Sequence, residues 1–233
     1  MTPKPYLLWV NSRITSPTQV SASKFEHWYD TKHIPDVFST KMITSACRYK
    51  TIVANAESPY LALYPFESMS MLQSKEFAAI PDEDTETFPG PSHSCYHFAR
   101  FDTRVYEYVD GFEKEGAKAG TATLIISAAL QPAQGTDSDF HAWYKDEHYR
   151  TLSSCPGYVR TRRYKLTNTF LPDVDPPRYL ALHEFESEVL PETELAETAE
   201  TEWAKRILGN LEKQEVGCFK LAGEFSGELE EKS

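Results

Sequence analysis

Short apolar runs, separated by turn-forming residues, recur along the chain and predict strands. Runs of this kind, rich in Tyr, Val, Ile, Leu and Phe, fit strands better than helices. The predicted strands are 6–11, 44–53, 59–66 and 95–102 in the first half, and 121–130, 158–166, 178–185 and 216–225 in the second.

Other stretches carry apolar residues at helical spacing. Phe25, Tyr29 and His33 fall at i, i+4 and i+8, so they share one face of a helix over 21–33. Pro35 predicts that this helix ends at His33, because the position before a proline avoids the α region. The other predicted helices are 68–79, 137–149 and 191–210.

The two halves of the chain repeat one another. FEHWYDTKH at 25–33 is matched by FHAWYKDEH at 140–148, 115 positions later. PYLALYPFES at 59–68 is echoed by RYLALHEFES at 178–187, where the offset has grown to 119, so the second copy carries an insertion of four residues. Such self-similarity predicts a duplicated unit. The expected parts are a first repeat at 1–104, a linker at 105–120, a second repeat at 121–226 and an acidic tail at 227–233.

The order of elements in each repeat predicts an α+β fold. A β-α-β-β-α-β unit is the ferredoxin-like arrangement, an antiparallel sheet with both helices on one face. The uncovered face of one sheet must be buried, and a second copy of the unit is the obvious partner. Two such sheets, closing at their edges, form an eight-stranded, barrel-like pseudo-dimer that can hold a small ligand.

Alternation along two strands suggests which side chains line that interior. Successive strand residues point to opposite faces, so Leu61 and Leu63 oppose Tyr60, Ala62 and Tyr64. We expect the leucines to lie under the helices and the tyrosines to face the cavity, as do Tyr179 and His183 in the second copy. The alternative is a well-packed aromatic core with satisfied hydroxyl groups.

Composition excludes several classes of protein. The net charge of −11 argues against nucleic acid as a partner, because a phosphate backbone needs a basic face. No apolar run approaches the ~20 residues of a membrane span or forms a secretory signal. The four cysteines make no CxxC pair or zinc spacing, which favours reduced thiols in a cytoplasmic protein. No dinucleotide, P-loop, serine-hydrolase or HExxH motif is present, so we expect no cofactor and no metal.

The repeated motifs resemble a known family. F-x-x-W-Y-x-x-x-H, continued as H-I-P in the first copy, a strand carrying R-Y-K and a strand ending in F-E-S are similar to the EthD-type branch of the dimeric α+β barrel superfamily. The tandem single-chain form resembles fungal EthD-domain proteins, which are associated with aromatic polyketide and other secondary-metabolite pathways. The superfamily includes cofactor-independent monooxygenases, isomerases, polyketide cyclases and, more remotely, heme peroxidases. The resemblance therefore implies a fold more strongly than a reaction.

Four histidines are candidates for acid/base catalysis. His33 corresponds to the histidine of the family's H-x-P motif, and His148 is its repeat without the proline. His183 replaces Tyr64 on the expected cavity face, and His97 lies in the expected last strand of the first repeat. Histidine suits proton transfer near neutral pH, although each could instead be a structural residue.

Aromatic residues on the same faces are candidates for binding the substrate. They are Trp28, Tyr29, Tyr60, Tyr64, Trp143, Tyr144 and Tyr179. Arg48 and Arg163 lie beside them on strands; we favour edge-strand charges that discourage aggregation over groups that stabilise an enolate or carboxylate.

The favoured function is cofactor-independent catalysis on an aromatic, polyketide-like molecule inside the barrel. Histidine-mediated proton transfer would support a dehydration, cyclisation, decarboxylation or isomerisation, and we favour a lyase or cyclase. The alternatives are a cofactor-free, anthrone-type monooxygenase and a non-catalytic ligand-binding or stress-response protein of the same fold. The only expected partner is the small molecule, bound by a pseudo-twofold monomer or a homodimer.

Overall fold

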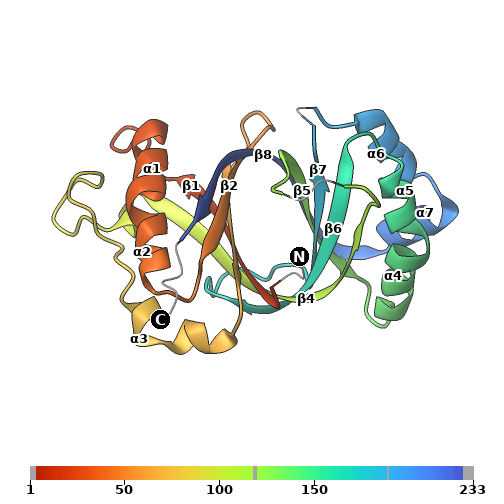
Figure 1. Cartoon of the computed structure of the whole chain (residues 1–233), viewed down its shortest axis with the longest axis horizontal. Helices are drawn as coiled ribbons and strands as arrows, with labels where there is room; N and C mark the ends of the chain where they lie inside the picture. The colour runs from red at the N-terminus through yellow and green to blue at the C-terminus, as the bar shows by residue number, and fades with distance from the viewer. Residues whose placement is uncertain (1–3, 118–119, 188, 228–233) are drawn as a thin grey trace.

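The computed structural model describes residues 4–117, 120–187 and 189–227. Its strands close into one barrel in the order β1-β3-β2-β8-β5-β7-β6-β4, with helices on two opposite sides (Figure 1). Every pairing between neighbouring strands is antiparallel. The predicted α+β pseudo-dimer of two ferredoxin-like units is therefore confirmed.

Unit one supplies the first half of these elements. They are β1 (Tyr6–Ile14), α1 (Ala22–Trp28), the π-turn η1 (Tyr29–His33), α2 (Ile34–Ser39), β2 (Ser45–Thr51), β3 (Tyr60–Phe66), the 3-10 turn η2 (Met69–Gln73), α3 (Lys75–Ala78), the 3-10 turn η3 (Cys95–His97) and β4 (Ala99–Glu113).

Unit two repeats this order with longer helices in its second half. Its elements are β5 (Leu124–Pro132), α4 (Asp137–Trp143), the π-turn η4 (Tyr144–His148), α5 (Tyr149–Ser153), β6 (Tyr158–Thr169), β7 (Tyr179–Phe185), α6 (Glu192–Thr198), α7 (Glu202–Leu208) and β8 (Leu211–Ser226).

The two units are joined along two seams rather than by a free linker. β4 pairs with β1 of its own unit and with β6 of unit two, and β8 pairs with β5 and with β2 of unit one. The expected linker at 105–120 is therefore strand as far as Glu113. Of the expected tail at 227–233, all but Gly227 lies outside the described residues.

The first helix continues past the proline that was expected to end it. The Ile34 N–H donates to the carbonyl of Tyr29, which makes a π-turn, and Pro35 lies in the first turn of α2. Because the chain is already helical before it, Pro35 removes one backbone hydrogen bond, and it does so next to a turn whose hydrogen bonding is already irregular. Unit two has the same π-turn at the same place without a proline, so Pro35 does not cause it.

The two faces of the sheets are the reverse of those expected. Leu61 and Leu63 pack in the barrel interior with Trp9 and with residues of unit two, whereas Tyr60, Ala62 and Tyr64 lie under the helices of unit one. Unit two follows the same pattern. Both faces of each sheet are buried, so alternation separates them but does not identify which one lies inside.

The barrel interior is an apolar core shared by the two units. Trp9 belongs to this core, and its indole N–H donates to the Ser127 hydroxyl at 3.2 Å across the barrel. Arg104 covers the Trp9 ring at 4.7 Å and is bound by Asp102 and Glu215. Within the described residues, no helix has the length and apolar character needed to cross a membrane.

Candidate active site

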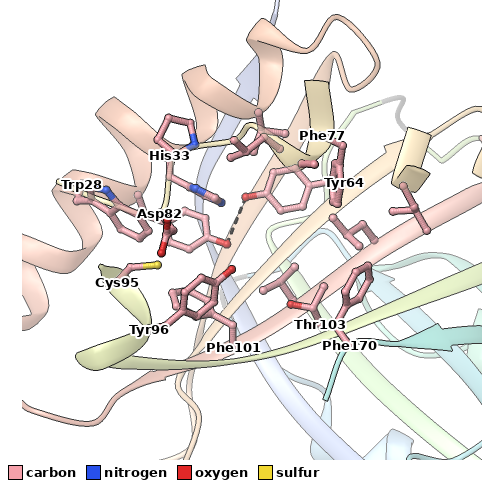
Figure 2. A pocket seen from close by; sticks show the side chains of 18 of the residues that line it. Trp28, His33, Tyr64, Phe77, Asp82, Cys95, Tyr96, Phe101, Thr103 and Phe170 are labelled. Carbon is pink, nitrogen blue, oxygen red and sulfur yellow. Dashed lines mark hydrogen bonds between the residues drawn. The ribbon is translucent and has the colours of Figure 1, made fainter. Parts of the chain in front are cut away.

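A cavity of about 740 Å³ lies in unit one, between the outer face of its sheet and its helices. This volume is typical of a site for a small molecule. Its walls are mainly apolar and aromatic (Figure 2). The lining residues are Leu8, Val10, Trp28, Tyr29, His33, Val37, Tyr64, Leu72, Phe77, Ala78, Ile80, Pro81, Asp82, Cys95, Tyr96, Phe101, Thr103, Phe170 and Leu171.

The short second helical segment of unit one leaves room for this cavity. η2 and α3 span only 69–78, and the chain then continues as a loop along the cavity wall. In unit two, α7 packs against α4 and places Ala204 and Ile207 in the same buried cluster as Tyr144. The corresponding space of unit two is therefore occupied by a helix.

His33 places an imidazole ring in the cavity wall, at the end of the π-turn. It stacks on Trp28 with ring centroids 5.1 Å apart and meets the edge of Tyr29 at 4.9 Å. Its Nδ1 is buried and has no hydrogen-bond partner among the described residues. Burial lowers the pKa of His33 to about 4, so the imidazole is neutral at pH 7 and has one unprotonated ring nitrogen.

Two tyrosine hydroxyl groups meet beside this imidazole. The Tyr64 hydroxyl on β3 donates to the Tyr29 hydroxyl at 3.3 Å (Figure 2). Burial raises the pKa of Tyr29 to about 12 and that of Tyr64 well above its ordinary value. Both groups stay protonated at neutral pH, and because the Tyr29 oxygen accepts from Tyr64, its own proton can be donated to an oxygen atom in the cavity.

A buried arginine holds the π-turn against the sheet. Arg48 on β2 donates to the Glu26 carbonyl at 2.9 Å and to Asp30 Oδ1 at 2.6 Å, and its guanidinium lies 5.2 Å from the centre of the Tyr29 ring. In unit two, Arg163 lies 3.9 Å from the centre of the Tyr144 ring. Both arginines are buried, so the expectation of exposed edge-strand charges is wrong.

The structure brings four of the expected site residues together in the cavity: Trp28, Tyr29, His33 and Tyr64. Of the other expected aromatic residues, Tyr60 packs on Phe25, and the Tyr179 hydroxyl donates to Asp137 at 2.6 Å. Trp143 and Tyr144 occupy the equivalent positions in the core of unit two.

His148 and His183 form a separate buried pair in unit two. Their ring centroids are 5.8 Å apart, His148 stacks on Trp143 at 4.2 Å, and His183 Nδ1 lies 2.8 Å from the Thr161 hydroxyl. Burial lowers the pKa of His183 to about 3 and that of His148 well below its ordinary value. Neither ring lines the cavity of unit one.

The sequence predicted that His97 lies on a strand, and this prediction is wrong. His97 belongs to the 3-10 turn η3 before β4, where its ring is exposed and its Nδ1 lies 2.7 Å from the Ser92 hydroxyl. The same turn instead brings Cys95 and Tyr96 to the cavity wall.

Sequence reasoning missed the far end of the cavity. Phe101 and Thr103 come from the start of β4, and Phe170 and Leu171 come from the connection between β6 and β7 of unit two. For Phe170 and Leu171, the one feature of the sequence that could have indicated a special role was the insertion that distinguishes the second repeat from the first.

The cavity wall is poor in charge. Among the described residues that line the cavity, Asp82 is the one acidic residue, and none is a lysine or an arginine. The Asp82 carboxylate accepts a hydrogen bond from the Ser94 hydroxyl at 2.6 Å. No cluster of three or more potential metal ligands occurs in the part of the chain that the structure describes.

A curated protein resembles most of the two-repeat chain. The Core atranone cluster (CAC) protein 1 of Stachybotrys chlorohalonatus is 24% identical over 194 residues, which cover 78% of this chain and 82% of that protein. No protein-family model matches the chain, so the finer EthD assignment stays a prediction.

Solved structures share the architecture at low sequence identity. A candidate monooxygenase of Fusobacterium nucleatum matches with a TM-score of 0.60 at 6% identity, covering 98% of each chain. An anthrone oxidase-like protein matches with a TM-score of 0.59 at 10% identity, and the match covers 97% of this chain and 95% of that protein. A chlorite dismutase of Candidatus Nitrospira defluvii matches with a TM-score of 0.59 at 9% identity, and the match covers 94% of this chain and 92% of that protein. The chain therefore has the dimeric α+β barrel fold, built from two repeats on one polypeptide.

Proposed function

We propose that this chain is a cofactor-independent enzyme that binds an uncharged aromatic, polyketide-like molecule in the cavity of unit one and moves a proton with His33. The carrying observation is a neutral imidazole in the wall of a large aromatic cavity, next to two protonated tyrosine hydroxyl groups. The relative from the atranone cluster supports a role in small-molecule metabolism.

The lining favours an uncharged substrate. A bound carboxylate or phosphate would find no cationic side chain in the cavity, and Asp82 would repel it. Burying an unpaired charge is costly. Flat rings suit the walls, where Trp28, Phe77, Tyr96 and Phe101 offer stacking and edge contacts.

Proton transfer by His33 accounts for the favoured reaction classes. The neutral imidazole takes a proton from an activated C–H group or a phenol and becomes an imidazolium ion. The Tyr29 hydroxyl, oriented by Tyr64, donates to the oxygen on which negative charge develops. The imidazolium then returns the proton to carbon in an isomerisation, or to a departing hydroxyl in a dehydration, which releases water. We favour a lyase or cyclase.

Exchange of the C10 hydrogens of anthrone tests the proton-transfer step. Anthrone is neutral and tricyclic, and its C10–H bond is activated by the carbonyl group. In D2O under argon, the wild type should accelerate deuterium incorporation measured by NMR. His33→Ala should lose about 100-fold or more of that acceleration, as expected for a general base.

A matched histidine variant and an aerobic run complete the experiment. His97→Ala removes an exposed ring outside the cavity and should exchange anthrone at the wild-type rate. Full exchange by His33→Ala would overturn the proposed role of this residue. Formation of anthraquinone with uptake of O2, dependent on the same cavity, would favour the monooxygenase alternative, whereas binding without exchange would favour a ligand-binding protein.

A further inference from the structure

The insertion in the second repeat lies next to the cavity of the first. In unit one, β2 ends at Thr51 and β3 begins at Tyr60; in unit two, β6 continues to Thr169 and β7 begins at Tyr179. The four extra residues therefore lengthen β6 and the connection after it. The first two residues of that connection, Phe170 and Leu171, line the cavity.

A backbone hydrogen bond fixes where this connection starts. The Phe170 N–H donates to the Thr103 carbonyl at 3.0 Å, and Thr103 itself lines the cavity from β4 of unit one. Figure 2 shows Phe170 beside Thr103, at the end of the cavity away from Trp28. The Phe170 side chain is 46% exposed, so it contacts both the cavity and solvent.

Exposed ion pairs link the rest of the connection to strands on both sides. Arg100 of β4 donates to Asp173 at 3.0 Å, and Lys213 of β8 binds Asp175. Pro172, Pro176 and Pro177 restrict its backbone, and the last two are buried. Such a segment is a preformed wall rather than a free loop, so it offers a ligand a fixed boundary at little cost in entropy.

We propose that Phe170 and Leu171 determine the size of the molecule that the cavity of unit one accepts. Unit two thus contributes to specificity at a site whose ionisable group belongs to unit one. The inference rests on the proposed function for the class of ligand, but it does not depend on any chemical step. Truncation at position 170 should lengthen the cavity at its open end, and a larger ring there should shorten it.

A series of neutral phenols of increasing size tests this boundary. The probes are 1-naphthol, 9-phenanthrol and 1-hydroxypyrene, with binding followed by quenching of tryptophan fluorescence and confirmed by calorimetry. In the double variant Phe170→Ala, Leu171→Ala, the ratio of the Kd for 1-hydroxypyrene to that for 1-naphthol should fall about tenfold. Phe170→Trp should raise the same ratio by about fivefold, because small changes in an apolar pocket shift selectivity by such factors.

The corresponding connection of unit one offers a matched control. Val53 follows β2, is 51% exposed and does not line the cavity. Val53→Ala should leave the Kd ratio unchanged. Circular dichroism and thermal unfolding of each variant separate a change in selectivity from a loss of fold.

The outcomes distinguish this inference from the proposed function. If the ratio is the same in the wild type, the folded double variant and Phe170→Trp, the two residues do not set ligand size. If the ratio shifts as expected but no variant or wild type exchanges anthrone, the specificity role stands and the catalytic proposal fails. If the wild type binds no probe, both proposals fail.

Discussion

At the residue scale, burial gives three histidines the same charge state in two different surroundings. His33, His148 and His183 are all neutral at pH 7, because their protonated forms would lose solvation. Only His33 borders the cavity. The base that we propose is therefore His33, whereas the His148–His183 pair lies away from the cavity and should make the fold sensitive to acid.

Acid should therefore destabilise the protein, and replacing His183 should reduce this loss of stability. The folded-state pKa of His183 is about 3, below its unfolded value of about 6.5, so between these values only the unfolded chain binds the proton. Stability falls as pH falls through this window. From pH 7 to pH 5, one such histidine costs about 2 kcal/mol.

Urea denaturation of His183→Asn at the two pH values measures this contribution. An asparagine can keep a hydrogen bond to the Thr161 hydroxyl without titrating. The drop in unfolding free energy between pH 7 and pH 5 should be smaller than in the wild type by about 2 kcal/mol. An equal drop in both proteins would show that the histidine is charged or solvated in the folded state.

At the element scale, sequence patterns located the strands and helices better than their ends and faces. The end expected at His33 was wrong because the helix accommodates Pro35 next to the irregular hydrogen bonding of the π-turn. The inward faces were reversed because helices cover one face of each sheet and the partner sheet covers the other. Alternation still predicted correctly which residues of β3 share a face with Tyr64, and that face borders the cavity.

The clamp between β2 and η1 shows how one buried side chain positions an element. Removal of Arg48 leaves the Glu26 carbonyl and Asp30 without this donor and frees the π-turn that carries Tyr29 and His33. Arg48→Met keeps the apolar stem and should lower the unfolding free energy by about 2–3 kcal/mol. Urea denaturation at pH 7 measures the loss, and weaker binding of 1-naphthol should accompany it.

A surface ion pair supplies the comparison for this variant. Arg13 binds Glu57 at the protein surface, where solvent screens the charges. Arg13→Met should change the unfolding free energy by no more than about 0.5–1 kcal/mol. Equal effects at the two positions would contradict a special role for the Arg48 clamp.

At the scale of the whole molecule, the repeat predicted the architecture but not that both units contribute residues to the cavity. Self-similarity required two matching sheets, and the barrel followed from the need to bury their free faces. The contribution of Phe170 and Leu171 to the cavity of unit one depends on the seam between β4 and β6, which joins residues far apart in sequence. No local pattern encodes such a contact.

The seams predict that neither half is stable by itself. Each unit alone would expose its share of the apolar barrel core and the unpaired edges of two strands, which favours association. Fragments 1–117 and 120–233 should aggregate or self-associate when expressed singly and should form a 1:1 complex when expressed together. Size-exclusion chromatography with light scattering checks this, and a folded monomer of either fragment would contradict it.

The continuous chain through both units has a consequence for how such a site can evolve. In a homodimer, every substitution appears twice, because the same sequence forms both halves. Here Tyr64 and His183 vary independently, as do the connections 52–59 and 170–178. A mutation that reshapes one repeat does not occur in the other. One repeat can therefore be selected for activity while the other is selected for the stability of the fold.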